Sequence, residues 1–368
     1  RKRREISIGN TSFLSFVPIR LSDLTPDIEM VDWVWYGLIA KGHATLLSAF
    51  WKAGKSTLIG HLLKAIQEGR EFAGEKTNPA KVLILSEESK GIWARRKDEL
   101  GLNLEAWIVC RPLKQKPNHK EWIKILKQLA EFCEDENIDL FIIDTLSGFW
   151  DVFDENQASQ VSSSLLPLNF FLEKNIAVLL IHHFRKSEGD EGTAVRGSGV
   201  LGSWADILIE FRRLEGKNPN DTQRQLIGRS RFEETPKDIV IEMVEGVYLL
   251  RGTKADVSKE TKLSQVLIIL NDFSEGLTVT EVWDNWNPEE FGKKPEKRTI
   301  RNYIDSLLKD GRIKEAGKKR VGKTEALVYR IVGNDTPNNA GKSSQQTISF
   351  EANNGGKESG ISIGDERS

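Results

Sequence analysis

The sequence is poor in cysteine and has no long hydrophobic run. Its 2 cysteines, Cys110 and Cys133, have the spacing of neither a disulfide framework nor a zinc site. No stretch approaches the roughly 18 consecutive apolar residues of a membrane-spanning helix, and no signal peptide is recognised. We therefore expect no membrane partner and a location in the reducing cytoplasm.

An excess of one charge is also missing. The chain has 53 basic and 54 acidic residues among 368, a formal net charge of −1. Overall charge therefore neither supports nor excludes a nucleic-acid partner, and local charge has to decide. Hydrophobic residues make up 39% of the chain, enough for one sizeable core and a second, smaller domain.

Short apolar runs alternate with helical patterns through the first two thirds of the chain. Continuous apolar runs of this kind are typical of strands buried on both faces of a parallel sheet. We predict strands at 44–49, 81–86, 107–110, 139–144, 177–182, 206–211, 224–229, 238–242 and 247–250. Helical patterns lie between most of the earlier runs, as at 58–69 and 120–136. This alternation predicts an α/β fold with a mostly parallel central sheet and right-handed crossovers.

The tetrapeptide AGKS, the second half of a phosphate-loop pattern, occurs at 53–56 and again at 340–343. A phosphate loop needs a buried strand before it and a helix after it, because the helix N-terminus presents free N–H groups to the phosphates. The first copy has both, in ATLLSA and STLIGHLLKAI, whereas the second lies in the polar tail. We interpret the second copy as a chance match.

The first copy carries alanine at Ala49, where the pattern has glycine. Alanine is acceptable if the turn keeps a negative φ there. In this interpretation Lys55 reaches the β- and γ-phosphates and the Ser56 hydroxyl binds Mg²⁺. Lys52 either adds charge at the γ-phosphate or is a solvated loop lysine, and Trp51 either covers the nucleotide or packs on the surface. The predicted nucleotide-binding residues are Ala49, Phe50, Trp51, Lys52, Ala53, Gly54, Lys55, Ser56 and Thr57.

Carboxylates follow two other predicted strands. Asp144 ends the apolar run DLFIID, which is the Walker B pattern for holding Mg²⁺. Glu87 and Glu88 follow KVLILS, where a carboxylate can polarise the water that attacks the γ-phosphate. We favour Glu87 for that role; the alternative is an acidic helix start capped by Ser86 or Ser89.

Two histidines end a further strand in AVLLIHHFRK. A polar group at the carboxyl end of such a strand lies where ligands of α/β sheets bind, so His182 or His183 can sense the γ-phosphate or nucleic acid. A neutral structural histidine is the alternative. A glycine-rich segment, SEGDEGTAVRGSG, follows and includes Arg196.

These motifs together resemble the RepA-like AAA branch of the RecA-like ATPases, which includes hexameric plasmid and phage helicases. The resemblance covers about 36–250 and rests on SAFWKAGKST, LILSEES, FIIDTLSGFW, LLIHHFRK, RGSGVLGSWADILIEF and RSRFEETPKDIVIEM. It implies a RecA fold, ring or filament assembly, and ATP hydrolysis between subunits. By motif it implies Walker A roles for Lys55 and Ser56, the catalytic glutamate for Glu87, Walker B for Asp144 and the sensor for His183.

Two departures from the family pattern stand out. Ala49 replaces the first glycine, and Ala205-Asp206 lies where some helicases of the group have an arginine finger. We predict that Arg196 acts instead as the arginine finger that reaches a neighbouring subunit, and Arg212 and Arg213 are the alternatives. Both departures weaken the expectation of fast, ring-dependent hydrolysis.

The C-terminal third predicts a small domain that resembles a winged helix-turn-helix. We expect helices over 262–273, from a capping box at 278–281, and over 296–311, followed by strands at 312–316 and 326–332. Residues 291–323 hold twelve basic and four acidic residues, a local net charge of +8. The expected DNA contacts are Lys297, Arg298, Arg301 and Asn302 on the third helix and Lys318, Lys319 and Arg320 on the wing. A basic but protein-binding winged helix is the alternative.

The expected organisation has five segments: an N-terminal segment or linker at 1–35, the ATPase domain at 36–250, a polar linker at 251–261, the winged helix at 262–332 and a disordered tail at 333–368. We expect a Mg²⁺-dependent ATPase that forms a homo-oligomer, such as a hexamer. It acts on DNA, single-stranded through the core and duplex through the winged helix, as a replicative-type helicase of a plasmid, phage or mobile element. The alternatives are an ATP-controlled DNA switch for recombination or regulation, and a DNA adaptor that binds nucleotide without hydrolysis.

Overall fold

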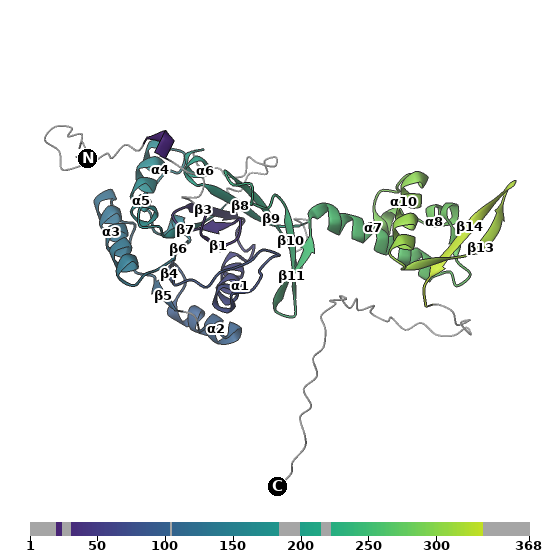
Figure 1. Cartoon of the computed structure of the whole chain (residues 1–368), viewed down its shortest axis with the longest axis horizontal. Helices are drawn as coiled ribbons and strands as arrows, with labels where there is room; N and C mark the ends of the chain where they lie inside the picture. The colour runs from purple at the N-terminus through teal and green to yellow at the C-terminus, as the bar shows by residue number, and fades with distance from the viewer. Residues whose placement is uncertain (1–19, 24–30, 104, 184–198, 215–221, 334–368) are drawn as a thin grey trace, which may run out of the picture. The chain divides into compact units, whose positions relative to one another are not determined.

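The computed structural model describes residues 20–23, 31–103, 105–183, 199–214 and 222–333 (Figure 1). Arg196, the second AGKS copy and the tail at 334–368 lie outside these residues. The chain divides into two compact units, Arg1–Glu260 and Thr261–Ser368. No helix in the described ranges is long and apolar enough to cross a membrane.

The first unit is built on a nine-stranded sheet in the order β11-β10-β9-β8-β3-β7-β6-β4-β5. Strands β8, β3, β7, β6, β4 and β5 are parallel to one another, whereas β9, β10 and β11 continue the sheet antiparallel. The expected α/β fold with a mostly parallel sheet is therefore present. The strands are β3 (Ala44–Ala49), β4 (Val82–Ser86), β5 (Ala106–Cys110), β6 (Leu140–Asp144), β7 (Ala177–His183), β8 (Ile207–Arg213), β9 (Gln223–Ser230), β10 (Ile239–Val244) and β11 (Val247–Gly252).

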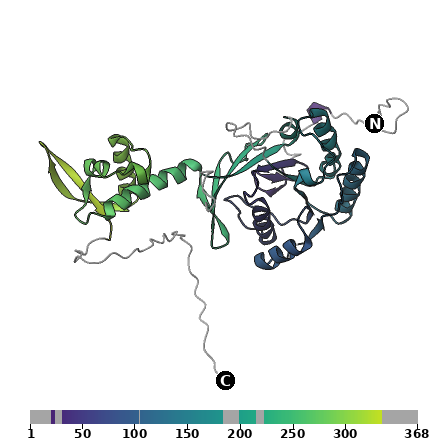
Figure 2. The same ribbon diagram turned by 180° about the vertical axis from the view of Figure 1, so that it is seen from behind.

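Helices cover both faces of this sheet (Figures 1 and 2). Alternate residues of β4 belong to two separate cores: Val82 and Ile84 pack with α1 and α2, and Leu83 and Leu85 pack with α3 and the helices that follow β6. This two-sided burial explains why the strand sequences are continuously apolar. The helices are α1 (Lys55–Glu68), α2 (Lys90–Leu100), α3 (His119–Asp135), α4 (Ala158–Leu165), α5 (Asn169–Leu172) and α6 (Val200–Trp204), with 3-10 turns η1 (Leu21–Asp23), η3 (Leu146–Gly148) and η4 (Leu166–Leu168).

The fold begins earlier than the sequence pattern suggested. Strands β1 (Trp33–Trp35) and β2 (Ile39–Ala40) form a hairpin whose strand residues are all buried. The indole Nε1 of Trp35 donates to the Phe72 carbonyl at 3.1 Å, tying the hairpin to the segment after α1. Residues 33–35 therefore belong to the core of the first unit, and our assignment of them to a linker was wrong. Their short run was too brief to carry a periodic signal.

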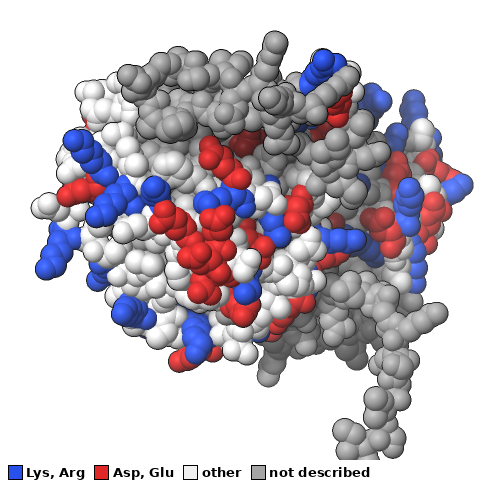
Figure 3. Space-filling model, turned by 60° about the vertical axis from the view of Figure 1, so that its left-hand side comes forward, with Lys and Arg blue, Asp and Glu red and all other residues white. Residues whose placement is uncertain are grey.

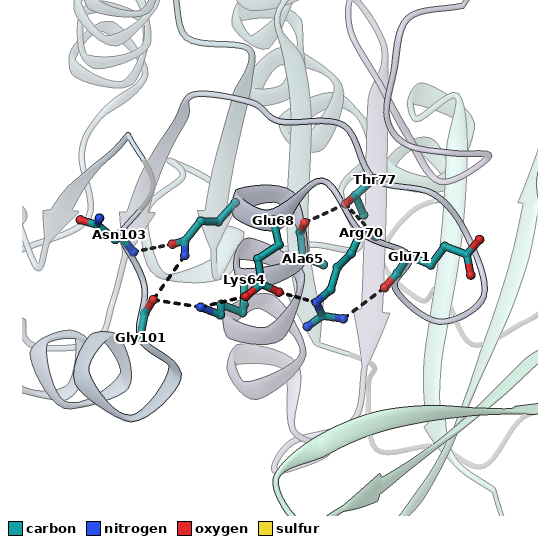
Figure 4. A network of polar contacts seen from close by, with 9 residues as sticks. Lys64, Ala65, Glu68, Arg70, Glu71, Thr77, Gly101 and Asn103 are labelled. Carbon is teal, nitrogen blue, oxygen red and sulfur yellow. Dashed lines mark hydrogen bonds and ion pairs between the residues drawn. The ribbon is translucent and has the colours of Figure 1, made fainter. Parts of the chain in front are cut away.

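Polar contacts anchor the C-terminal part of α1 (Figure 4). The Lys64 Nζ and Gln67 Nε2 atoms donate to the carbonyl of Gly101, which ends α2, at 3.1 and 3.4 Å. The Thr77 hydroxyl lies 3.0 Å from the Ala65 carbonyl oxygen and 2.6 Å from that of Arg70. These contacts fix one end of α1, so its N-terminus holds a defined position at the sheet edge.

Up to residue 333, where its description ends, the second unit has three helices after α7 and a small antiparallel sheet in the order β12-β14-β13. Its core contains Ile300, Ile304 and Leu307 of the helix over 297–309, together with Trp286 and Tyr329. The elements are α7 (Lys254–Asn271), β12 (Leu277–Thr278), α8 (Val279–Asp284), α9 (Pro288–Phe291), α10 (Lys297–Lys309), β13 (Ile313–Val321) and β14 (Thr324–Ile331). The expected capping box is present, because Thr278 and Glu281 bond each other's backbone N–H groups.

Two expectations for this part of the chain were wrong. Most of the predicted polar linker at 251–261 is the first half of α7, which Thr253 and Asp256 start with reciprocal hydrogen bonds. A polar composition did not prevent a helix here, because this local cap satisfies its first N–H groups. The hairpin strands are also longer than expected and turn at Gly322, where φ is 63°. Lys318, Lys319 and Arg320 therefore lie in strand β13, not in a loop.

Candidate functional site

The predicted site residues of the first unit gather where four adjacent parallel strands end. The order β3-β7-β6-β4 brings together the loop after β3, His183 at the end of β7, Asp144 at the end of β6 and Glu87 directly after β4. Parallel strands place all their carboxyl ends at one edge, where ligands of α/β sheets usually bind. Residues far apart in sequence thus meet around one loop.

The loop itself has the backbone of an anion site. Ala49 is still in β3 and keeps the negative φ that the alanine substitution requires. Gly54 adopts φ 98°, a conformation that favours glycine, and stands at the N-cap of α1 without any side-chain cap. The first N–H groups of α1 are therefore available to a ligand, and the helix dipole favours an anion there.

Lys55 is buried at the start of α1 and points back over the loop. Its Nζ lies 3.2 Å from the Phe50 carbonyl oxygen and 3.0 Å from Nδ1 of His183. Burial lowers the pKa of Lys55, and the nearby carboxylates of Asp144 and Glu87 act in the opposite direction. The ammonium is thus held among groups that a phosphate can replace as its partner.

Ser56 and Asp144, the two predicted Mg²⁺ ligands, contact each other. The Ser56 hydroxyl donates to Oδ2 of Asp144 at 3.0 Å. Burial raises the pKa of Asp144 to about 6; Glu87 and Glu88 push it the same way, whereas Ser56 and Lys55 oppose the rise. A divalent cation next to this carboxylate would offset the cost of burying its negative charge.

The donor set suits Mg²⁺. Hydroxyl and carboxylate oxygens are its usual protein ligands, with water and phosphate filling the other positions. The described part of the chain contains no group of three or more His, Cys, Asp or Glu side chains able to hold a metal by themselves. Ser56 and Asp144 therefore fit a cation shared with a nucleotide better than a permanent protein-only metal centre.

The geometry separates the two glutamates after β4. Glu88 makes an ion pair with Arg96 through both carboxylate oxygens, at 2.6 and 3.2 Å. Ser89 caps α2 by accepting from the Ile92 N–H. The helix cap that the alternative expected is therefore present at Ser89, but neither the cap nor the ion pair with Arg96 involves the carboxylate of Glu87.

Glu87 instead faces the segment that follows Asp144. Its Oε2 accepts from the Thr145 hydroxyl at 3.2 Å, and its N–H donates to the Asp144 carbonyl at 2.9 Å. A Cβ added at Gly148 would lie 2.8 Å from the same oxygen, so a side chain there would displace the carboxylate. Thr145 and Gly148 therefore lie against the candidate site; the sequence did not single them out, although both follow Asp144 closely.

The two histidines at the end of β7 also have different surroundings. His183 accepts from Lys55 at Nδ1, and its pKa falls to about 4 through burial and the charges of Lys55 and His182. It is therefore neutral at pH 7. His182 is buried, lies 3.3 Å from Glu155 and packs edge-on against Trp150. His183 faces the loop, whereas His182 has a structural environment.

The outer residues of the loop are accessible. Phe50 and Trp51 are 45% and 74% exposed, and Thr57 is exposed on α1. Lys52 adopts φ 58° and holds its Nζ 4.3 Å from the centre of the Trp51 ring. Within the described residues, then, Trp51 and Lys52 contact each other and stand at the rim of the site.

The three candidate arginine fingers differ in their surroundings. Arg196 lies outside the described residues. Arg212 pairs with the buried Glu210, and Arg213 places Nη2 3.5 Å from the Lys52 carbonyl oxygen of its own chain. Asp206, at the position where some helicases have the finger, accepts from the Ala44 N–H at 3.1 Å. Arg212 and Arg213 therefore have partners within their own subunit.

In the second unit the predicted DNA-binding residues of α10 have two kinds of surroundings. Arg298, Arg301 and Asn302 form an exposed strip on α10. Lys297 lies instead over the ring of Trp283, 4.6 Å from its centre, beside Lys294 at 3.7 Å.

On the hairpin all three basic residues are exposed. The Lys318 Nζ atom lies 3.9 Å from a carboxylate oxygen of Glu325, and Lys319 makes a 2.5 Å ion pair with Glu281 of the α8 capping box. The pairing follows from strand alternation, because Lys319 points to the opposite face of β13 from its two neighbours.

Charge on the first unit is mixed. On the face in Figure 3, acidic side chains gather near the middle and basic ones are scattered around them. That face lacks the single-sign basic stripe of a phosphate-backbone surface.

Comparison with known proteins gives a family match that includes the candidate phosphate loop. A family model described as an AAA domain matches residues 12–189. The match contains the loop, Glu87, Asp144 and His183, and it ends before β8. No curated protein matches the chain. Among solved structures, the chain is similar to one titled "Crystal structure of the RadB recombinase", with 18% identity, a TM-score of 0.40, and coverage of 57% of this chain and 91% of that one.

Proposed function

We propose that the chain is a Mg²⁺-dependent ATPase of the RecA-like class that works as an oligomer on DNA. The observation that carries the proposal is the contact between Ser56 and Asp144 beneath a glycine-containing loop at a helix N-terminus. Hydroxyl, carboxylate, buried lysine and free N–H groups converge there, which is the set that a nucleoside triphosphate and Mg²⁺ require. The match to an AAA domain over 12–189 supports it.

Each side chain has a distinct task in this proposal. Lys55 contacts the β- and γ-phosphates, and Ser56 and Asp144 hold Mg²⁺, which when bound neutralises charge that develops on the transferred phosphoryl group. Glu87, steadied by Thr145, orients the attacking water and accepts its proton. His183 contacts Lys55, so loss of the γ-phosphate, a partner of Lys55, changes the hydrogen bond between Lys55 and His183.

Assembly is the second part of the proposal. Hydrolysis between subunits requires a cation from the neighbouring chain, and Arg196 remains our candidate for it. Arg212 and Arg213 are less suited, because each contacts its own chain. Light scattering with a non-hydrolysable ATP analogue tests this part: we expect rings or filaments, and a monomer at all concentrations would contradict it.

DNA binding is the third part. Two features of the second unit support a winged helix that reads duplex DNA: the exposed residues Arg298, Arg301 and Asn302 on α10, and a long basic hairpin. Single-stranded DNA would engage the ATPase core of the assembled oligomer. The biological role that fits best is a replicative-type helicase of a plasmid, phage or mobile element.

The main alternative is an ATP-controlled switch that binds DNA without unwinding it. Arg213 contacts the phosphate loop of its own chain, which makes it less suited to act as an arginine finger in a neighbouring subunit. The loss of one finger candidate favours this alternative. A non-hydrolysing adaptor is less well supported, because a carboxylate is in place to activate water. Glu88 is paired with Arg96, whereas the carboxylate of Glu87 makes no salt bridge to a Lys or Arg among the described residues and lies beside the segment after Asp144.

One set of measurements distinguishes these functions. ATP turnover is measured alone, with single-stranded DNA and with duplex DNA, alongside displacement of a labelled strand. We expect DNA-stimulated turnover with strand displacement. Stimulated turnover without displacement supports the switch, and nucleotide binding without turnover supports the adaptor. A chain that binds no nucleotide would refute the proposal as a whole.

A further inference from the structure

Arginines from the antiparallel part of the sheet contact the back of the phosphate loop. Arg224 of β9 donates from Nε to the Ala53 carbonyl at 3.0 Å. Arg213 of β8 lies at the paired position, and its Nη2 is 3.5 Å from the Lys52 carbonyl oxygen. Both strands lie beyond the residues that match the AAA domain. The loop is therefore held by a part of the fold that its own motif does not include.

The same region is supported by Tyr248 of β11. A Cβ added at Gly54 would lie 3.9 Å from the Tyr248 hydroxyl, so this buried side chain stands close behind the loop. The ring of Tyr248 also packs edge-on against His61 of α1, with centres 5.2 Å apart. Strand β9 thus contacts the loop, and β11 packs against the helix that follows it, close to Gly54.

The direction of the carbonyl groups matters for an anion site. Phosphate binds to backbone N–H groups, and a carbonyl oxygen turned toward it would repel it. A guanidinium that binds the Ala53 carbonyl from behind keeps this oxygen away from the phosphates. The adjacent residue, Lys52, has φ 58°, which is unfavourable for a side chain larger than glycine and persists only when its surroundings enforce it.

We propose that Arg224, assisted by Arg213, is a positioning residue that holds the phosphate loop in its anion-binding conformation. This inference rests on the proposed nucleotide-binding function. It assigns to β9 a direct effect on nucleotide affinity through one hydrogen bond, Arg224 Nε–H to Ala53 O. Arg224 does not touch the phosphates in this role and acts through the backbone of Ala53.

Two substitutions separate this hydrogen bond from the charge of the guanidinium. In Arg224→Gln, the amide nitrogen takes the same place along the side chain as Nε, so the donor is kept and the charge is removed. In Arg224→Met, a methyl group takes that place and both are removed. Dissociation constants for Mg²⁺–ADP are measured by calorimetry on the full chain, with thermal unfolding of each variant as a check on folding.

We expect Arg224→Met to weaken ADP binding roughly tenfold to a hundredfold, the effect of removing a hydrogen bond from a charged donor. Arg224→Gln should stay within about threefold of the wild type. Arg229→Met, an exposed arginine on the same strand, is the control and should leave the affinity unchanged.

Equal affinity of Arg224→Met and wild type would overturn the inference. Equal weakening in the Met and Gln variants would also overturn it, because the charge and not the hydrogen bond would then matter. If Arg224→Met fails to fold, the affinities of Arg224→Gln and Arg224→Lys for ADP are compared instead. Tighter binding by the Gln variant supports the role of the hydrogen bond, and tighter binding by the Lys variant contradicts it. Absence of ADP binding by the wild type would remove the proposed function as well, whereas the other contrary outcomes leave that function intact.

Discussion

The hydroxyl of Ser56 and the carboxylate of Asp144 lie 3.0 Å apart, although 88 positions separate them in the chain. Ser56 is in the first turn of α1, and Asp144 is the last residue of β6, one strand removed from β3 beyond β7. A hydroxyl and a buried carboxylate at this separation can share one Mg²⁺ ion. The pair therefore links the phosphate loop to the strand that completes its metal site.

Removal of the Lys55 ammonium should reduce both turnover and nucleotide affinity. In Lys55→Ala we expect kcat to fall by at least about 10²–10³, because a fixed charge aimed at the phosphates is removed. ATPase assays and ADP calorimetry measure the two effects. Lys342→Ala, in the second AGKS copy, is the matched control and should behave as the wild type. A loss of activity in that variant would contradict our choice between the copies.

Exchange of Glu87 for glutamine should separate binding from hydrolysis. The amide keeps the size of the side chain but cannot accept the water proton, so turnover should fall by about 10²–10⁴ while ADP still binds. Glu88→Gln is the control: Glu88 is paired with Arg96, and its substitution should change turnover only a few-fold. If the two variants exchanged behaviours, the role of the water-activating base would pass to Glu88.

The buried carboxylate of Asp144 should make the nucleotide-free chain less stable as pH rises. Its pKa is raised from 3.8 to about 6 in the folded state, so folding is favoured by the protonated form below pH 4 and this contribution disappears as pH rises through 6. Asp144→Asn removes the titration and should be more stable than the wild type at pH 7–8, by on the order of 2–3 kcal/mol. At pH 4 the difference should vanish.

Urea unfolding from pH 4 to 8, without Mg²⁺ and nucleotide, measures this effect. The same series with Mg²⁺–ADP is the internal comparison, because a bound cation favours the ionised carboxylate and should reverse the trend. A stability difference that is constant with pH would show that Asp144 does not titrate in this range.

Duplex binding should depend on the two outward-facing basic residues of β13 more than on the residue between them. Replacing Lys318 and Arg320 together with alanine should flatten the plot of log K against log salt by up to about 1.8, because each phosphate that the protein no longer neutralises reduces the slope by about 0.9. Lys319→Ala should change the slope little, because its ammonium is paired with Glu281. Salt titrations of the full chain with a duplex oligonucleotide measure the slopes.

Identical slopes for wild type and the Lys318/Arg320 double variant would mean that the hairpin does not touch the phosphate backbone. The protein-binding alternative for the second unit would then be favoured. A large change from Lys319→Ala alone would instead show that the ion pair with Glu281 opens when DNA binds.

The sequence by itself determined the elements and the main chemical groups. Continuous apolar runs predicted the central strands β3, β4, β6 and β7 within a few residues, because burial on both faces leaves almost no polar positions. The motifs likewise named Lys55, Ser56, Glu87 and Asp144, since each is adjacent to a strong local pattern. The weak points were segments without such a pattern, the short β1 strand and the polar start of α7.

Only the tertiary structure decided which members of ambiguous pairs face the site. The sequence alone does not say which histidine, His182 or His183, or which glutamate, Glu87 or Glu88, faces the site. That choice depends on strand order and on partners such as Arg96 and Glu155. Nor did any local pattern point to Arg224, which reaches the phosphate loop from 171 residues away. Local periodicity records whether a residue is buried, but the identity of its neighbour is set by long-range strand pairing and register.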